Sequence, residues 1–350
     1  SDSDDTTKLP IQYIPVHDYC CNLLMDIVPF LTDKKYKELT SLSFNFDKKH
    51  LSKIKNFSTG QLIDWLKSNG YEKEYEKFLI VSIFKGILAD FVEYIEFSLI
   101  SSRRSRLNVA LNLIRKPFLE NLIVLEQILS KPEELISAFT EKEPEKYDPS
   151  SEKDKLGLIH ECIKNTGNNI FFKADIIYAL RFDKNNPNSY YAISNQAVHL
   201  VTTRNKAYET EKQNFNLIFT PETNYKELWS CYYDFIPLLL YYAVEIIETI
   251  ANRETKQPKE EFLFRKFSRL IGYLFITEIL YPRHAIKDSA LDKFSGKFLV
   301  YCPSCKKENV IFKSDFHDIY SNNILCCKHC LIDMLYDKKI LSELLESFFN

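Results

Sequence analysis

Four cysteines in the C-terminal part of the chain have the spacing of a metal site. They form two Cys-x-x-Cys pairs, Cys302 with Cys305 and Cys327 with Cys330, and twenty-one residues separate the pairs. One such pair presents two thiolates to an ion, and two pairs complete a tetrahedral shell of sulfurs around Zn²⁺. This shell leaves no position for a catalytic water. We therefore predict one structural zinc ion.

Two other interpretations of these cysteines are chance clustering of buried thiols and a redox-active dithiol. A single Cys-x-x-Cys pair fits either of them, but two pairs at this separation favour zinc. Lys306, Lys307 and Lys328 are close enough in sequence to offset the negative charge of four thiolates. Cys326 is a fifth candidate ligand, but pairing it with Cys330 lengthens the turn by one residue. We expect that Cys326 does not bind the ion.

The segment that carries these cysteines resembles the zinc-ribbon family. The resemblance covers residues 298–331 and depends on Cys302-Pro303-Ser304-Cys305 and Cys327-Lys328-His329-Cys330. Such ribbons usually carry Gly directly after each pair, whereas Lys306 and Leu331 stand there in this chain. The resemblance implies a small β module that binds nucleic acid or protein.

The residues around the cysteines define the rest of this module. Residues 297–301 and 309–312 predict two short strands, and a polar loop is expected between the second strand and Cys327. Residues 331–349 are apolar at helical spacing and predict a terminal helix. This helix either packs on the rest of the protein, which we favour, or binds a partner. Seven Lys and seven Asp or Glu in residues 296–350 indicate that the module is not a basic surface.

A second group of residues has the types needed for acid–base chemistry on RNA. His199 and Arg204 lie in or just beyond one predicted helix, and Arg115 and Glu120 lie in another. A His can transfer the proton while an Arg holds the scissile phosphate. The alternative, which we favour, is a buried His199 with a hydrogen-bond partner and an Arg115 paired with a Glu of a neighbouring helix.

Segments 115–120 and 194–199 resemble HEPN-like helical proteins of bacterial abortive-infection and toxin systems. The resemblance implies a helical domain and metal-independent cleavage of RNA. The HEPN ribonuclease signature, an Arg followed a few residues later by His, does not occur here. Arg181 is far from His199, and Arg283 directly precedes His284. The resemblance therefore favours the helical fold more than the ribonuclease activity.

A third group of residues makes the segment before the cysteines basic. Its candidate nucleic-acid-binding residues are Arg265, Lys266, Arg269 and Arg283. Aromatic residues are interleaved with them, and aromatic rings together with Arg can stack on single-stranded bases. At helical spacing such residues are more often part of a core, and this is the interpretation that we favour.

Composition limits the remaining function classes. The 350 residues have a formal charge of −2 and contain only 7 Gly, which argues against a globally basic surface and against Gly-rich phosphate loops. The two most apolar stretches, 78–100 and 232–250, contain charged residues, so we expect no membrane span. The 9 cysteines include four at metal spacing, and no secretory signal opens the chain. These features predict a cytoplasmic protein.

Helical periodicity dominates the first 290 residues and must position these groups. A short helix is predicted to begin at residue 132. The other predicted helices span about 59–65, 72–101, 107–129, 152–164, 174–182, 190–203, 221–252 and 259–280. Pro117 and Pro237 are predicted to break or kink the helices that contain them. The buried face of 72–101 is predicted to carry Phe78, Ile83, Ile87, Phe91, Ile95 and Leu99. A strand is predicted at 215–219 and a surface loop at 140–153.

The predicted architecture is mainly α. A multi-helix bundle is predicted for residues 1–290, either as one domain or as two subdomains that divide near 140–153. Residues 296–350 are predicted to form the Cys₄ zinc ribbon with a C-terminal helix. The leading hypothesis for function is a zinc-stabilised interaction protein of a bacterial antiviral defence or toxin-type system, with a protein or nucleic-acid partner. The alternatives are the HEPN-like ribonuclease and a nucleic-acid-binding protein that uses segment 265–287 and the ribbon.

Overall fold

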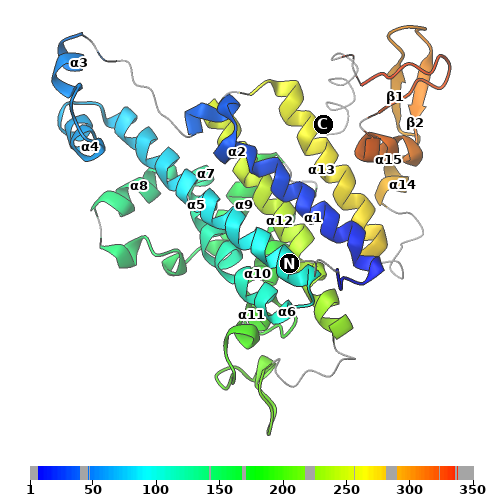
Figure 1. The fold of residues 1–350 in the computed structure, drawn as a ribbon, viewed down its shortest axis with the longest axis horizontal. Coiled ribbons are helices and arrows are strands. Elements are labelled where there is room, and N and C mark those ends of the chain that lie inside the picture. The colour runs from blue at the N-terminus through cyan, green and yellow to red at the C-terminus, as the bar shows by residue number, and fades with distance from the viewer. Residues whose placement is uncertain are drawn as a thin grey trace, which may run out of the picture.

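A computed structural model describes residues 7–39, 46, 48–141, 143–167, 171–216, 225–255, 257–280, 290–322, 324–335 and 337. In these residues the chain is mainly helical and has one small antiparallel sheet near its C-terminal end (Figure 1). The predicted fold class is therefore confirmed. Among the described helices, none is both long and apolar enough to cross a membrane.

The elements follow one another in chain order. The helices are α1 (Ile14–Ile27), α2 (Pro29–Thr32), α3 (Lys48–Ile54), α4 (Thr59–Ser68), α5 (Glu72–Arg103), α6 (Leu107–Leu113), α7 (Leu122–Ser130), α8 (Pro132–Glu141), α9 (Lys155–Thr166), α10 (Ala174–Phe182), α11 (Tyr190–Val198), α12 (Tyr225–Thr255), α13 (Lys259–Leu280), α14 (Ala290–Phe294) and α15 (Lys313–Asn322). The strands are β1 (Phe298–Tyr301) and β2 (Glu308–Ile311), paired with Phe298 opposite Ile311.

The core is built around α12, which packs against α1, α7 and α13 (Figure 1). Side chains on all sides of its middle part are buried, from Tyr232 to Ala251. A helix that is apolar all round belongs in the interior of a large domain, which explains why this stretch is so apolar. Pro237 lies inside α12, and the helix continues through it.

Pro117 divides the helical pattern that begins at Leu107, as predicted. α6 ends at Leu113, a short π-helical turn runs from Pro117 to Asn121, and α7 begins at Leu122. Proline cannot donate the backbone hydrogen bond that a regular helix needs at this position. Arg115 lies two residues beyond the end of α6, in the short segment before this turn.

The buried face of α5 differs from the predicted one. Its fully buried apolar residues are Val81, Phe84, Leu88, Phe91, Val92, Ile95 and Leu99, whereas Phe78, Ile83 and Ile87 are only half-buried. The predicted set advances mostly in steps of four residues, and each such step rotates about 40° around a helix. A buried stripe must alternate steps of three and four, as the observed set does.

Other predicted boundaries are reproduced to different degrees. α10 and α13 span the predicted residues, whereas α9 begins at Lys155 and α11 ends at Val198. The predicted loop at 140–153 contains two short 3₁₀ turns. The predicted strand at 215–219 and the start of the following helix fall largely on 217–224, outside the described residues. The terminal helix predicted at 331–349 is wrong for residues 331–335, which are not helical because Leu331 adopts a φ of 61° and Asp333 bridges to Cys326. Most of its remaining residues lie outside the described part of the chain.

The polar loop predicted between β2 and Cys327 is instead helix α15, which docks on α13. Phe316 and Ile319 are buried at a spacing of three residues, so even this polar segment has an apolar face. The ring of Phe316 lies 6.2 Å from that of Phe267 on α13. Lys313 Nζ lies 2.8 Å from a carboxylate oxygen of Glu278. The C-terminal module therefore shares a continuous core with the helical body.

Candidate metal centre and neighbouring pockets

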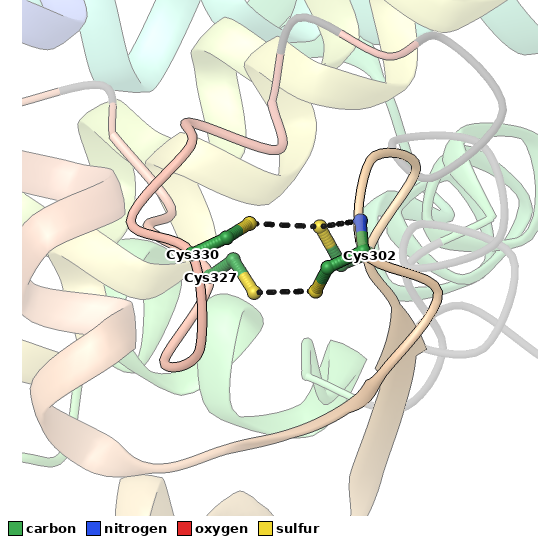
Figure 2. A group of neighbouring side chains, drawn as sticks. Cys302, Cys327 and Cys330 are labelled. Atoms are coloured by element: carbon green, nitrogen blue, oxygen red, sulfur yellow. Dashed lines mark hydrogen bonds between the residues drawn. The ribbon is translucent and has the colours of Figure 1, made fainter.

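The four predicted cysteines lie together, and the loop of Cys302 faces the loop of Cys327 and Cys330 (Figure 2). The Sγ atoms of Cys302 and Cys330 are 3.5 Å apart, and those of Cys305 and Cys327 are 3.7 Å apart. All four sulfurs lie within 4.8 Å of one another. Four Zn–S bonds near 2.3 Å in a tetrahedron place the sulfurs about 3.8 Å apart. These cysteines could hold a metal ion of that size.

The first pair of cysteines is held in a tight backbone turn. The N–H of Cys302 donates to the carbonyl of Lys307 over 2.9 Å, and the N–H of Lys306 donates to the carbonyl of Cys302 over 3.0 Å. Lys306 has a φ of 60°, in the left-handed region. The turn is therefore closed at both ends, with Lys306 in a conformation that glycine adopts at lower cost.

The second pair repeats this geometry. The N–H of Cys327 donates to the carbonyl of Ile332 over 2.8 Å, and the N–H of Leu331 donates to the carbonyl of Cys327 over 2.9 Å. Leu331 has a φ of 61°. The backbone after both pairs thus has the conformation expected where ribbons usually carry glycine, although neither residue is glycine.

N–H donors point at the sulfurs. The N–H of Cys305 lies 3.5 Å from Cys302 Sγ, and that of His329 lies 3.4 Å from Cys327 Sγ. Burial raises the pKa of Cys327, but backbone N–H donors from Cys330 and His329 and the Asn309 amide lower it to about 6. Thiolates are the form that binds metal, so these donors favour the binding form.

Asn309 on β2 links the two cysteine turns and was not singled out from the sequence. Its side-chain amide donates to Lys307 O over 3.1 Å and lies 3.5 Å from Cys327 Sγ. Its carbonyl oxygen accepts from the Lys328 N–H over 2.8 Å. The side chain is buried. One residue therefore orients both turns, as outer-shell partners do in metal sites.

Two further predictions concern residues beside the four cysteines. Cys326 is exposed, and its sulfur is not among the four that lie within 4.8 Å of one another. Lys328 Nζ lies 2.9 Å from Asp315, so that carboxylate already compensates part of its charge. Lys306 Nζ donates to the carbonyl of Pro303 beside the first turn.

The structure contradicts a nucleic-acid-binding role for three of the four basic candidates and confirms the favoured interpretation that they belong to the core. Lys266 and Arg269 are buried, and Arg265 is only partly exposed. Arg265 pairs with Glu248, Arg269 with both Glu245 and Glu248, and Lys266 Nζ lies 3.6 Å from Glu245. Buried charges need partners of opposite sign, and α12 supplies them. These three residues therefore stabilise the packing of α13 on α12 and do not form a basic surface.

Asp26 on α1 adds a further carboxylate to this ion cluster. Arg269 Nη1 lies 3.4 Å from Asp26, and burial raises the pKa of that carboxyl although Arg269 opposes the shift. Arg283, the fourth predicted member of the basic segment, lies outside the described residues.

The structure also corrects the favoured interpretation of His199 as a buried residue. α11 ends at Val198, earlier than predicted, so His199 caps the helix and its side chain is exposed. His199 and Arg204 line one pocket of about 410 Å³, together with Tyr191 and Tyr208.

Arg115 and Glu120 lie next to this pocket. Arg115 Nη1 donates to Ser194 Oγ over 3.1 Å and to Asn195 Oδ1 over 3.3 Å, so the predicted pairing of Arg115 with a Glu is wrong. Arg115 and Glu120 line a second pocket, of about 390 Å³, and Tyr191 lines both pockets. All four predicted residues therefore lie around α11, in two adjoining pockets.

The second pocket is lined by residues that sequence analysis missed: Lys153, Lys155, Tyr178, Phe182, Lys184 and Tyr191. They come from the segment before α9, from α9 and α10, and from the loop and helix that follow. No local motif joins segments so far apart, and only their packing places these side chains together.

Comparison of the chain with protein-family models, with curated proteins and with solved structures finds no match. The HEPN-like resemblance stays a prediction, and the four cysteines near the C-terminus are compatible with a zinc-binding module.

Proposed function

We propose that this chain is a zinc-stabilised helical interaction protein in which the metal ion is structural. The observation that carries the proposal is the set of four sulfurs at tetrahedral distances, held in two closed backbone turns. Four thiolates fill the coordination shell of Zn²⁺, so the ion has no open position for a substrate or a catalytic water. Its contribution is folding free energy rather than chemistry.

The position of the cysteines along the chain supports this role. β2 and α15 lie between Cys305 and Cys327, so one ion closes the loop that contains the docking helix. Because α15 packs on α13, the ion also fixes how the C-terminal module sits on the helical body. Loss of the ion is expected to loosen α15 together with the two cysteine turns.

Exposed apolar side chains on the module support an interaction with a partner. Leu299 and Tyr301 lie two residues apart on β1 and are 48% and 52% exposed, and Leu331 is 77% exposed. Residues two apart on a strand lie on the same face of a sheet. Contiguous exposed apolar surface is typical of protein-binding sites. The proposed partner is therefore a protein that covers this face.

Zinc content and stability test this function. The purified protein is expected to contain one zinc ion per chain by native mass spectrometry. Cys327→Ser is expected to abolish or strongly reduce zinc binding, whereas Cys326→Ser is the matched control and retains the ion. A chelator is expected to lower the melting temperature of the parent protein. A protein that takes up no zinc, or whose zinc depends on Cys326, contradicts the proposal.

Asn309→Ala tests the orienting role of the buried amide. Loss of an outer-shell partner typically weakens metal affinity about 10- to 100-fold. Competition with a zinc chelator measures this change, and Glu308→Gln, at an exposed neighbouring position, is expected to have no effect. Equal affinities of the two variants contradict the role of Asn309.

A metal-independent ribonuclease is the second candidate function. The observation that favours it is the exposed imidazole of His199 in one pocket with Arg204, beside Arg115. Turnover of single-stranded RNA by the zinc-loaded protein is expected to be lost in His199→Ala and kept in His160→Ala, which removes another exposed imidazole. Turnover that is absent, or that persists in His199→Ala, contradicts this candidate. A place in a bacterial antiviral defence or toxin-type system stays a prediction, which phage challenge of expressing cells tests.

A further inference from the structure

The second pocket beside α11 concentrates positive charge that no carboxylate of the described residues approaches to ion-pair distance. Its lining includes Arg115, Lys153, Lys155 and Lys184, and Glu120 is the only acidic residue among the lining residues. In the part of the chain that the structure describes, none of these four cations forms an ion pair. The whole chain has a formal charge of −2, so this pocket departs strongly from the average surface.

The contrast with α13 shows that this charge is unusual. There, Arg265, Lys266 and Arg269 each have a glutamate partner. In the pocket, Lys155 Nζ lies 3.4 Å from the carbonyl of Ser150, and Arg115 donates only to neutral groups. Neutral oxygens satisfy the hydrogen bonds of a cation but leave its charge uncompensated. An anionic ligand would compensate the charge of these cations.

The pKa of the Lys155 amine is lowered. Burial is the largest cause, the carboxylates of Glu152 and Asp148 oppose the shift, and the positive charges of Arg181 and Lys184 add to it. A bound anion would reverse the effect of the like charges.

Aromatic side chains form part of the same wall. Tyr178, Phe182 and Tyr191 line the pocket, and the rings of Tyr178 and Phe182 are 5.7 Å apart. Lys184 Nζ lies 5.5 Å from the centre of the Tyr191 ring, and Lys155 Nζ lies 5.6 Å from that of Phe182. Each of these cations thus sits beside a ring, an arrangement that suits a ligand with a phosphate and a flat base.

The two pockets adjoin at Tyr191, which lines both. The first pocket adds Arg204, His199 and Tyr208, so cationic and aromatic side chains continue beyond the end of α11. We define the Tyr191 groove as these two pockets. Their volumes of about 390 and 410 Å³ lie in the usual range for ligand sites.

We propose that the Tyr191 groove binds a nucleotidyl ligand, with phosphate oxygens at Lys155, Lys184 and Arg115 and a base stacked on Tyr191. Cations provide affinity for phosphate without regard to sequence, and every base has a face that can stack. The ligand is a free nucleotide or a single-stranded nucleic acid, which share this chemistry. The proposal names a ligand for the interaction protein proposed above, but it requires neither zinc in the groove nor cleavage of the ligand.

Binding by the full, zinc-loaded chain tests the proposal. Fluorescence anisotropy with a short labelled single-stranded RNA measures binding of a nucleic acid. Displacement of that RNA by unlabelled ATP or UMP measures binding of a free nucleotide. The combined variant Lys155→Gln/Lys184→Gln is expected to bind the RNA at least ~10-fold more weakly. The slope of the logarithm of affinity against the logarithm of salt concentration is expected to become shallower by about 0.7 per lost phosphate contact. Tyr191→Ala is expected to weaken binding ~10-fold through lost stacking.

The control variant is Lys49→Gln/Lys53→Gln, which neutralises two exposed lysines of α3 and should bind as the parent does. Zinc content is measured for every variant, so loss of the folded metal module is distinguished from loss of the groove. RNA binding with no displacement by nucleotides identifies a nucleic-acid ligand, and tight nucleotide binding identifies a free nucleotide. If the zinc-loaded parent binds neither, or if the groove variants bind as tightly as the α3 control, the proposal is wrong.

Discussion

Tyr320 on α15 packs directly over Gly272 on α13. A Cβ atom placed on Gly272 would lie 2.5 Å from Tyr320 Cε2 and 2.8 Å from Tyr19 Cε2 of α1. The Tyr19 ring is fixed because its hydroxyl donates to the carbonyl of Arg269 over 2.9 Å and its side chain is buried. The missing side chain of one glycine thus lets α1, α13 and α15 meet, and this contact joins the C-terminal module to the helical body.

Gly272→Ala is expected to destabilise the protein. Overpacking typically costs about 1–3 kcal/mol, although the helix propensity of alanine offsets up to about 1 kcal/mol of this. Thermal unfolding measures the change. The matched control is Gly86→Ala in α5, where an added Cβ meets nothing within 4 Å and stabilises by about 0.5–1 kcal/mol. If both variants stabilise equally, Gly272 is not a contact point between helices.

Leu331→Gly is expected to stabilise the zinc-loaded protein by up to about 1 kcal/mol. Leu331 adopts a φ of 61°, which costs a residue with a Cβ about 1–2 kcal/mol relative to glycine. Its side chain is 77% exposed, so little packing is lost. Leu331→Ala keeps the Cβ and is expected to show no gain. Chemical denaturation compares the two variants, and equal stabilities contradict backbone strain at this turn.

Arg269→Met is expected to cost about 3–5 kcal/mol, because it leaves Glu245 and Glu248 buried without their strongest partner. Adding Glu248→Gln to this variant removes one buried carboxylate charge but also takes a partner from Arg265, so it is expected to recover only part of the loss. Lys35→Met disrupts an ion pair that is largely exposed and should cost less than about 1 kcal/mol. Denaturant titration measures all three, and similar costs for Arg269→Met and Lys35→Met exclude the proposed role of the cluster.

The stability of the protein is expected to fall below about pH 6.5 because of His17. Burial lowers the pKa of His17 from the ordinary value of 6.5, and its Nδ1 lies 2.9 Å from the hydroxyl of Tyr233. The unfolded chain therefore takes up a proton at a higher pH than the folded protein. The stabilising contribution of neutral His17 is present above pH 6.5 and is lost as the pH falls towards and through the lowered pKa.

Unfolding at a series of pH values checks this dependence. His17→Gln is expected to flatten the profile between about pH 7 and 5, whereas His160→Gln, at an exposed position, should keep the profile of the parent. A profile in His17→Gln as steep as in the parent contradicts the assignment.

Local features of the sequence were sufficient for much of the fold and for the cluster of four cysteines. Ser58 and Gln61 form a capping box where the helix predicted from residue 59 begins, and Pro117 divides its helix as predicted. The spacing of Cys302, Cys305, Cys327 and Cys330 was enough to name the four sulfurs that come together, because each pair needs only a tight turn. Such features depend on neighbouring residues, so they can be recognised without knowledge of the distant chain.

Tertiary contacts decided which charged and polar residues are accessible. The sequence allowed either a core or a surface position for Arg269, and carboxylates from α12 and α1 decided for the core. His199 was expected to be buried, but α11 ends before it and its side chain is exposed. Lys155 and Lys184 share a pocket only because α9, α10 and α11 pack together. Burial and charge pairing depend on residues far away in the sequence. The sequence by itself therefore determined most of the long helices and the four cysteines that come together, whereas packing determined the surfaces on which any activity depends.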